Sequence, residues 1–328
     1  MRGSEVTKRK YTSIEVCAGA GGQALGLERA GFAHLACVEI DPAACATLRR
    51  NREHWNVIEA DLRTWSPSPE VLSQQVDLLA GGVPCPPFSL AGRQLGRDDE
   101  RDLFPEMIRL VEEIQPRAVM IENVRGLMAR KFEGYRAEIM AELKELGYEL
   151  CGWELVNAAD YGVPQARLRS ILVAMVPDAA VHFRWPEPRA RRTTVGEALK
   201  NQMKAAGWEG ADEWARRASD VAPALVGGSK KHGGADLGPT RAKAAWRQLG
   251  VDAMGVADAP PPAGTDGMPR LTVEMAATIQ GFPASWKFQG RKTAAYRQVG
   301  NAFPPPVAKA IGDAIRAALL VMDVETEG

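Results

Sequence analysis

The fold is decided by residues 77–89, which read DLLAGGVPCPPFS. The apolar residues before the glycine pair predict a short buried strand, and the glycines with three prolines predict a stiff turn after it. Cys85 then lies in that turn, at the carboxyl end of a strand that we expect to be parallel. Open α/β sheets bind ligands there, so the thiol is a candidate nucleophile. A small buried hydrophobe is the alternative for any single cysteine, and the rest of the chain decides between the two.

A glycine-rich loop lies upstream. Residues 12–17 predict a strand that leads into AGAGG at 18–22 and then into a helix. Residues 35–40 predict a second strand, and Glu39 lies near its end. Glycines let the backbone approach a ligand, and an acid at the end of the second strand can hold a ribose diol. The pattern fits both a nicotinamide dinucleotide and the nucleoside of S-adenosylmethionine.

Two further acids follow predicted strands. Asp61 comes directly after the short strand at 57–60, where its carboxylate can accept a hydrogen bond from an adenine amino group, although a surface Asp would look the same in the sequence. Glu122 follows the buried strand at 118–121. Its strand end is expected beside that of Cys85, where the environment can raise the pKa of the carboxyl.

Two polar segments complete the candidate site. Residues 86–101 form a long polar loop with two glycines, which is typical of a functional lid. Arg167 and Arg169 are two positions apart, so in an extended segment they share a face. Both can then point at one site.

The composition is that of an ordinary globular protein, with 328 residues, 45% hydrophobic and 25% charged. No apolar run approaches the roughly 20 residues of a membrane span, and the first residues lack a signal-peptide core, so we expect a cytoplasmic protein. Five cysteines without a Cys-x-x-Cys pair, and four histidines without ligand spacing, argue against disulfides and against a metal site. The formal net charge is zero, so any nucleic-acid contact requires a local basic surface.

Such a surface is predicted within residues 186–270, where prolines and glycines accumulate and periodicity fades. The segment 227–234 reads GGSKKHGG, and Arg241 and Lys243 follow near Trp246. Basic side chains with glycine turns and an aromatic residue suit a phosphate backbone and base edges. A solvated basic face is the alternative for each of these residues.

Together the segments resemble the DNA (cytosine-5) methyltransferase family. The resemblance covers nearly the whole chain except 186–270, the region where target recognition varies in that family. It is carried, in chain order, by Ala18 to Gly22, Glu39, Asp61, Pro84-Cys85, Glu122-Asn123-Val124, Gln165, Arg167, Arg169, Thr272 to Pro283 and Gly300-Asn301. Two positions depart from the family pattern, because Cys17 stands where Phe is usual and Pro86 where Gln is usual.

The resemblance implies an α/β fold with a doubly wound, mostly parallel sheet of the Rossmann-like, S-adenosylmethionine-dependent type. It also implies a smaller, irregular target-recognition domain. We expect residues 1–185 with 271–328 to form a discontinuous catalytic domain, closed by Gly300-Asn301, and residues 186–270 to form the recognition domain. The expected protein is a bacterial enzyme of the restriction-modification type that acts on double-stranded DNA. It is expected to be monomeric, since no apolar helix lacks an intramolecular partner.

The resemblance further implies a mechanism. The Cys85 thiolate would attack carbon 6 of a flipped-out cytosine, so that carbon 5 can take the methyl group of S-adenosylmethionine. Glu122 would bind and protonate N3, Arg169 would hold the carbonyl O2, and Arg167 would be a supporting contact. No metal is needed for this transfer.

Residue roles carry over to the matching positions. The expected cofactor contacts are Cys17, Ala18, Gly19, Gly21, Gly22, Glu39, Ile40, Asp61, Leu62, Gly82, Pro84, Leu103, Asn301 and Ala302. The expected DNA contacts are Ser89, Arg93, Arg97, Gly228, Ser229, Lys230, Lys231, His232, Arg241 and Lys243.

Three alternatives remain open at this point. Relatives that methylate transfer RNA share these motifs, but they carry a Cys-Phe-Thr tripeptide that this chain lacks. A nicotinamide dehydrogenase would explain the glycine loop and Glu39, yet it leaves Pro84-Cys85 and residues 122–124 unexplained. A DNA-binding protein without catalysis is the third, although every expected bond-making residue is present.

Overall fold

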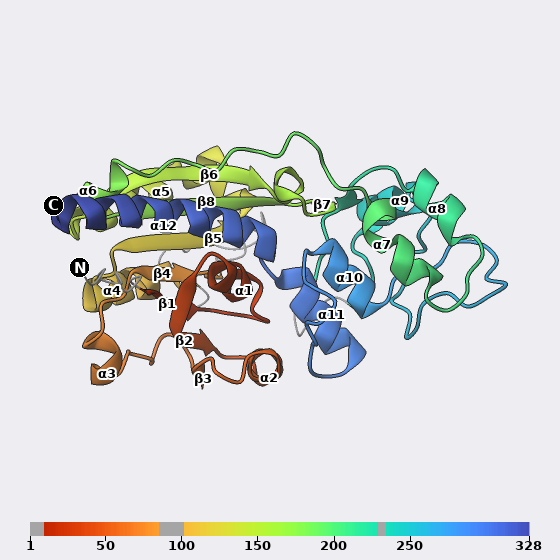
Figure 1. Cartoon of the computed structure of the whole chain (residues 1–328), viewed down its shortest axis with the longest axis horizontal. Helices are drawn as coiled ribbons and strands as arrows, with labels where there is room; N and C mark the ends of the chain where they lie inside the picture. The colour runs from red at the N-terminus through yellow and green to blue at the C-terminus, as the bar shows by residue number, and fades with distance from the viewer. Residues whose placement is uncertain (1–9, 85–101, 229–233, 328) are drawn as a thin grey trace, which may run out of the picture.

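The central feature is a seven-stranded sheet, seen in a computed structural model that describes residues 10–84, 102–228 and 234–327. The strand order is β3-β2-β1-β4-β5-β8-β6 (Figure 1). The strands are β1 (Tyr11–Val16), β2 (Phe32–Glu39), β3 (Val57–Glu59), β4 (Leu78–Gly81), β5 (Ala118–Val124), β6 (Glu149–Asn157) and β8 (Leu168–Met175). The first five are parallel, whereas β8 pairs antiparallel with both β5 and β6. The predicted doubly wound, mostly parallel sheet is therefore confirmed.

The chain reverses direction across the sheet at β1. It adds β2 and β3 on one side of β1, then β4 and β5 on the other. Loops that leave β1 and β4 diverge at this point and open a crevice at the carboxyl ends of the strands. The strand β2 begins at Phe32, three residues earlier than expected, because its pairing with β1 starts at Tyr11 opposite Phe32.

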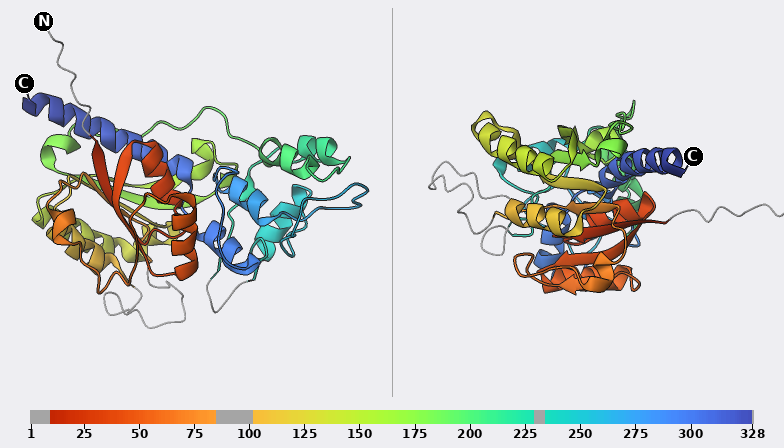
Figure 2. Two further views of the ribbon diagram at one scale, coloured as in Figure 1. Left: turned by 60° about the horizontal axis from the view of Figure 1, so that its bottom comes forward. Right: turned by 90° about the vertical axis from the view of Figure 1, so that its left-hand side faces the viewer.

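Helices cover both faces of the sheet. One face carries α1 (Gly22–Arg29) and α12 (Pro305–Glu327), and the other carries α4 (Phe104–Ile114) and α5 (Glu133–Glu145) (Figure 2). Consecutive residues of β4 show the alternation, since Leu78 packs in the core under α1 and α12 while Leu79 packs under α4 and α5. Burial on both faces explains why these strands read as continuous apolar runs.

The first and last helices approach each other closely. A Cβ atom at Gly26 would lie 2.5 Å from the Cβ of Ala308, and one at Gly22 would lie 2.1 Å from the carbonyl oxygen of Phe303. A Cβ at Gly312 would lie 2.9 Å from that of Ala30. Only glycine fits at such distances. The last helix thus packs on the first, as expected from the return of the chain at Gly300-Asn301.

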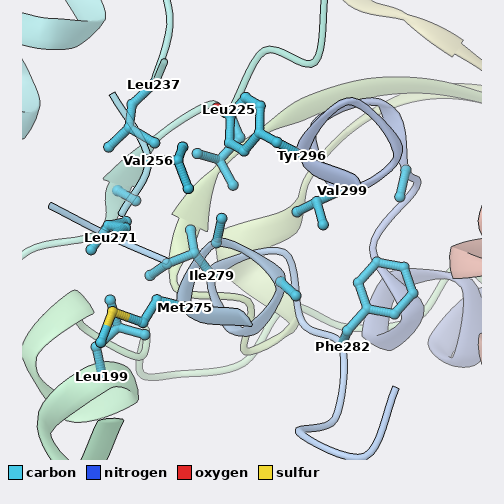
Figure 3. Close-up of a cluster of buried hydrophobic side chains, with 14 of the residues drawn as sticks. Leu199, Leu225, Leu237, Val256, Leu271, Met275, Ile279, Phe282, Tyr296 and Val299 are labelled. Atoms are coloured by element: carbon cyan, nitrogen blue, oxygen red, sulfur yellow. The ribbon is translucent and has the colours of Figure 1, made fainter. Parts of the chain in front are cut away.

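A third hydrophobic core extends from the sheet domain into the rest of the chain (Figure 3). Most of it comes from α7 (Val195–Lys204), α8 (Ala211–Arg217), α9 (Thr240–Gln248), α10 (Val273–Ile279) and α11 (Lys292–Asn301), and it also includes Leu25 of α1 and Leu48 of α2 (Pro42–Asn51). Residues 186–270 are therefore more helical than the fading periodicity indicated. Trp246, placed among the DNA-facing residues from the sequence, is instead fully buried in this core. The apolar face of α9 requires it there.

The helices α10 and α11 belong to this same core. Leu199 of α7 packs in one cluster with Met275 of α10 and Tyr296 of α11 (Figure 3). The division into 1–185 with 271–328 and 186–270 stays a prediction, and the packing adds that residues 273–301 share apolar contacts with 195–256.

Smaller elements complete the described structure. They are α2 (Pro42–Asn51), α3 (Pro69–Leu72), α6 (Pro177–Ala180), the short parallel pair β7 (Gln165–Ala166) and β9 (Ala222–Pro223), and three 3-10 helices at Arg125–Met128, Arg130–Phe132 and Ala158–Tyr161. Among the residues that the structure describes, no helix is long and apolar enough to span a membrane.

Candidate active site

A cavity of about 760 Å³ opens at the carboxyl ends of the parallel strands. The loops after β1, β2, β3 and β4 line it, Glu122 of β5 lies at its edge, and residues 297–303 at the end of α11 close it. A volume of this size is in the range of small-molecule and cofactor sites. The cavity lies at the carboxyl ends of the strands, where the sequence predicted a ligand, and at the point where the strand order reverses.

The glycine-rich loop shapes one wall. Cys17 and Gly19 have left-handed backbones, with φ of +51° and +53°, and both line the cavity. Gly21 has φ of +86°, and a Cβ there would lie 2.6 Å from Leu48 Cδ2. It is the one expected cofactor contact that does not line the cavity, since it makes the turn against Leu48 and Trp286 instead.

Glu39 is fixed by backbone amides at the end of β2. Its Oε2 accepts from the Gly19 amide at 2.6 Å and its Oε1 from the Asp41 amide at 2.7 Å. Burial raises the pKa of this carboxyl, while the amide hydrogen bonds act in the opposite direction. Each oxygen keeps a second lone pair, so the side chain can still accept from two vicinal hydroxyl groups.

Asp61 lines the same cavity from the loop after β3 and is held by Arg63. The guanidinium donates from Nε to Oδ1 at 3.0 Å and from Nη2 to Oδ2 at 2.8 Å. These bonds hold the pKa of Asp61 below its usual range, so the group is a carboxylate at neutral pH. Ile40 and Leu62, which follow Glu39 and Asp61 in the sequence, add apolar side chains to the cavity wall.

The edge of the cavity near β4 and β5 carries an ion pair. Arg169 Nε lies 2.8 Å from Glu122 Oε1. Burial raises the pKa of Glu122, and the neighbouring Arg169 opposes that effect. A Cβ at Gly82 would lie 3.1 Å from Glu122 Oε2, so the backbone after β4 runs directly against the carboxyl. Asn123 secures the same turn by donating from Nδ2 to the Val83 carbonyl at 2.9 Å.

Cys85 lies outside the described residues, one position beyond Pro84, which lines the cavity. The structure therefore describes this turn as far as Pro84, the residue before Cys85. The same limit applies to the expected lid at 86–101.

Arg167 and Arg169 have different hydrogen-bond and ion-pair partners. Arg167 is buried and donates from Nη1 to the Leu225 carbonyl at 2.7 Å and from Nη2 to the Gly300 carbonyl at 2.8 Å. The charges of both arginines nevertheless lower the pKa of Glu122, with Arg169 the stronger influence. Arg169 alone contacts Glu122.

The expected DNA contacts are only partly described. Ser89, Arg93, Arg97, Ser229, Lys230, Lys231 and His232 lie outside the described residues. The Gly228 carbonyl accepts from Asn301 Nδ2 at 3.2 Å, which places the start of that segment beside the cavity. Arg241 is exposed on α9, and Lys243 is paired with Asp236 at 2.9 Å. Their contact with DNA stays a prediction.

Thirteen of the expected cofactor residues line the cavity. They are Cys17, Ala18, Gly19, Gly22, Glu39, Ile40, Asp61, Leu62, Gly82, Pro84, Leu103, Asn301 and Ala302. Six further polar residues on the wall were missed, namely Glu15, Gln23, Asp41, Arg63, Arg297 and Gln298. Glu15 left a signal in the sequence, since it is the one charged residue in the strand predicted at 12–17. Among the described residues no cluster of His, Cys, Asp or Glu could hold a metal ion.

The fold is the α/β fold of the methyltransferases to which this structure is similar. A putative DNA modification methyltransferase from an Escherichia coli prophage superposes with a TM-score of 0.66 at 23% identity, covering 94% of this chain and 99% of that one. A DNMT2 variant of Spodoptera frugiperda gives 0.64 at 16% identity, covering 94% and 99%. At these identities the likeness establishes the fold.

Sequence comparison identifies the family. The sequence model of the C-5 cytosine-specific DNA methylase family matches residues 11–317. The Type II methyltransferase M.NaeI of Lentzea aerocolonigenes is 58% identical over 96% of this chain and 76% of its own length. M.NgoMIV of Neisseria gonorrhoeae is 52% identical over 94% and 98%. The chain belongs to the C-5 cytosine-specific DNA methylase family and is a DNA (cytosine-5) methyltransferase.

Proposed function

We propose that the chain transfers a methyl group from S-adenosylmethionine to carbon 5 of a flipped-out cytosine in a short duplex sequence, with Cys85 as the nucleophile. One observation supports this proposal most strongly. The backbone of Gly82, three residues before Cys85, runs against the Glu122–Arg169 ion pair at the edge of a cofactor-sized cavity.

The chemistry of the cavity fits the cofactor. Asp61 can accept from an adenine amino group, and Glu39 can accept from the two ribose hydroxyls. The two carboxyl oxygens of buried Glu15, without a hydrogen-bond partner, also face this wall. When bound, the cofactor supplies a methyl group activated by a sulfonium centre. We assign cofactor contact to the thirteen expected residues that line the cavity, and Gly21 the role of shaping the turn.

The chain's own residues then act on the base. Carbon 5 of cytosine is a poor nucleophile, and addition of the Cys85 thiolate to carbon 6 forms a carbon–sulfur bond that pushes electrons toward carbon 5. Glu122 holds N3 and gives it a proton as charge develops in the ring. Burial raises the pKa of Glu122, which favours the protonated form that this step requires. Once carbon 5 carries the methyl group, its proton passes to water and the carbon–sulfur bond breaks. Cys85 leaves as the thiolate and N3 returns its proton to Glu122, which restores the ring.

The arginines have separate roles in this scheme. Arg169 touches Glu122 and is placed to hold the carbonyl O2 of the base. Arg167 is a positioning residue, because it donates to the Leu225 carbonyl and to the Gly300 carbonyl, which directly precedes the cavity residues Asn301 and Ala302.

The DNA substrate is double-stranded in this proposal. Flipping the base out of the stack costs a few kcal/mol, recovered by contacts to the opened duplex. Residues 86–101 would close over the base and residues 186–270 would read the flanking bases, with Arg241 and Lys243 on the phosphate side. The proposed enzyme is a cytoplasmic monomer of a bacterial restriction-modification system.

The test is bisulfite sequencing of DNA from a methylation-free bacterial host that expresses the chain. We expect modified cytosines confined to one short motif, and none when Cys85→Ala is expressed. Cys151→Ala is the matched control, because that thiol lies on β6 outside the cavity and its loss should leave methylation intact. Persistent methylation in Cys85→Ala would refute the nucleophile, and absence of modified cytosine with folded wild-type protein would refute the substrate.

A further inference from the structure

A basic surface lies beside the cavity, in the turn that joins β5 to α5. Residues 124–136 contain four basic side chains and one acid, in a chain whose formal net charge is zero. Three of the four basic residues, Arg125, Arg130 and Lys131, are exposed, and we call these three the β5–α5 patch. Positive charge is therefore concentrated locally, where a partner of opposite charge can meet it.

The fourth basic residue, Arg136, holds the turn in shape. Its Nη1 donates to the Leu127 carbonyl at 2.6 Å and to the Ala129 carbonyl at 3.2 Å. Leu127 is fully buried in the core under α4 and α5. Because the backbone of the turn is fixed in this way, binding of a ligand has to order only the exposed side chains, which lowers its entropic cost.

No acid in the described part of the chain neutralises the β5–α5 patch. The two arginines form no ion pair there, the Lys131 ammonium lies 4.8 Å from the centroid of the Phe132 ring, and the neighbouring acid Glu133 is not paired with any of them. By contrast Lys243, which the sequence predicted as a DNA contact, is paired with Asp236 at 2.9 Å. The charges of the patch are thus available to an external anion.

The patch lies at the carboxyl edge of the sheet, where the cavity opens. Arg125 is three residues from Glu122, so their Cα atoms are at most about 11 Å apart. A second connection comes from α5, because the Tyr135 hydroxyl donates to the Asp102 carboxylate, and the next residue, Leu103, lines the cavity. The patch and the candidate active site therefore lie at the same edge of the sheet.

Duplex DNA has the charge and the spacing that suit this patch. Each strand carries one phosphate per about 3.4 Å of helix axis, so about three phosphates of a strand lie within 11 Å of a base that Glu122 holds. Arginine binds phosphate oxygens with two parallel hydrogen bonds, and lysine binds them as a point charge. Three cations spread over residues 125–131 match such a row of phosphates better than a single small anion.

We propose that the β5–α5 patch binds the phosphate backbone of the substrate duplex beside the flipped cytosine, an inference that rests on the proposed function. In that function residues 186–270 read the flanking bases, and the patch holds the duplex from the catalytic side. Contacts to phosphates carry no sequence information. The patch therefore fixes the position of the DNA without contributing to the choice of sequence.

The test measures how salt weakens the binding of a fluorescently labelled duplex of arbitrary sequence, by anisotropy. Each phosphate contact contributes about −0.9 to the slope of log Kobs against log salt concentration. In the triple variant Arg125→Gln, Arg130→Gln, Lys131→Gln we expect a slope less steep than that of wild type by about 2–3. The triple variant should still methylate the same motif in bisulfite sequencing, because no base contact is lost.

The triple variant Arg29→Gln, Arg50→Gln, Lys144→Gln is the matched control. It removes the same charge from exposed residues at the ends of α1, α2 and α5, at the amino edge of the sheet. Charges farther from the DNA than a Debye length are screened, so the slope should stay close to that of wild type. Calorimetry with S-adenosylhomocysteine checks folding, since neither triple variant changes a residue of the cavity.

A single variant covers the case in which the triple variant folds poorly. Arg125→Gln alone should make the slope less steep by about 0.9. Failure of wild-type protein to bind the duplex at low salt would overturn the proposed substrate itself. With wild-type binding intact, an unchanged slope in the patch variants, or an equal change in the control, would overturn only the role of the patch and leave the proposed function standing.

Discussion

At the scale of single residues, Glu122 is a carboxyl under two opposing influences. Burial favours its protonated form and Arg169 favours its ionised form. A group balanced in this way can both bind and deliver a proton. Gly82 and Asn123 keep the turn before Cys85 against this carboxyl.

The first prediction concerns that proton. Glu122→Gln keeps the hydrogen-bonding shape but cannot transfer a proton, so the single-turnover rate should fall by about 10²- to 10⁴-fold. Affinity for S-adenosylhomocysteine should stay nearly constant, because the wall formed by Glu39 and Asp61 is untouched. Rapid-quench kinetics and calorimetry measure the two quantities. A rate equal to wild type would remove Glu122 from the chemistry.

A second residue-scale prediction follows from Glu15, whose pKa is raised well above 4.5 by burial. Between about pH 4.5 and that raised value the folded protein binds more protons than the unfolded chain. The free energy of unfolding of the ligand-free enzyme therefore falls as pH rises through this window. Glu15→Gln lacks this loss and should be more stable than wild type at pH 8.

Urea unfolding at pH 5 and at pH 8 measures whether the free energy of unfolding falls as the pH rises. The gain in stability from Glu15→Gln should be larger at pH 8 than at pH 5, where the wild-type carboxyl is mostly protonated. A variant that is equally or less stable than wild type at pH 8 would show that the buried carboxyl has a partner after all.

At the scale of elements, the contact between α1 and α12 controls the cavity. Gly22 and Gly26 let the carbonyl of Phe303 and the Cβ of Ala308 come close to α1. Asn301 and Ala302, which line the cavity, lie immediately before this contact. The packing of two helices thus fixes the wall of a binding site.

The third prediction tests this packing. Gly26→Ala improves helix propensity, yet its Cβ would lie 2.5 Å from both Ala308 Cβ and the Pro305 carbonyl oxygen. We expect a net destabilisation of about 1–3 kcal/mol from overpacking, with weaker cofactor binding. Gly134→Ala, at an exposed position of α5 with no atom near the new Cβ, is the control and should stabilise by about 0.5–1 kcal/mol. Urea titrations of both variants measure these values, and stabilisation by Gly26→Ala would contradict the close contact.

At the scale of the whole molecule, residues 186–270 are joined to the rest of the chain by a shared hydrophobic core. The helices α7, α10 and α11 bury their apolar faces in one cluster (Figure 3). The backbones of Gly227 and Gly300 also touch, since a Cβ at Gly300 would lie 2.4 Å from the Gly227 nitrogen. Exchange of residues 186–270 alone therefore cuts through a core.

The fourth prediction compares two grafts from a family member of different specificity. Exchange of residues 186–302 keeps α7, α10 and α11 together, so it divides less of this core and should give a higher melting temperature than exchange of 186–270. Both folded chimeras should methylate the donor's sequence, as read by bisulfite sequencing. Equal melting temperatures would show that the two sides of the core are interchangeable, and retention of the original sequence would place base reading elsewhere.

The sheet and most residues of the cavity could be predicted from the sequence for one physical reason. Apolar runs end where parallel strands end, and ligands lie at that edge, so Glu39, Asp61 and Glu122 could be placed from strand ends alone. Glu15 was not predicted as a cavity residue because it lies within a strand and not after its end. Its distinguishing property is complete burial, which the sequence does not show. The contacts of Arg167 and the shared core of α7 with α10 depend on pairings between distant segments, which local patterns do not contain.

The close fit of α1 against α12 also sets the order in which the enzyme matures. Gly26 leaves the ribosome about 280 residues before Ala308, which at ordinary rates of translation is a delay of roughly 15–60 s. During that interval the inner face of α1 has no cover and the cavity lacks its last wall. A nascent chain can form the strands of the sheet, but it cannot yet assemble the complete cofactor pocket. Competence for methylation therefore arrives with the final helix.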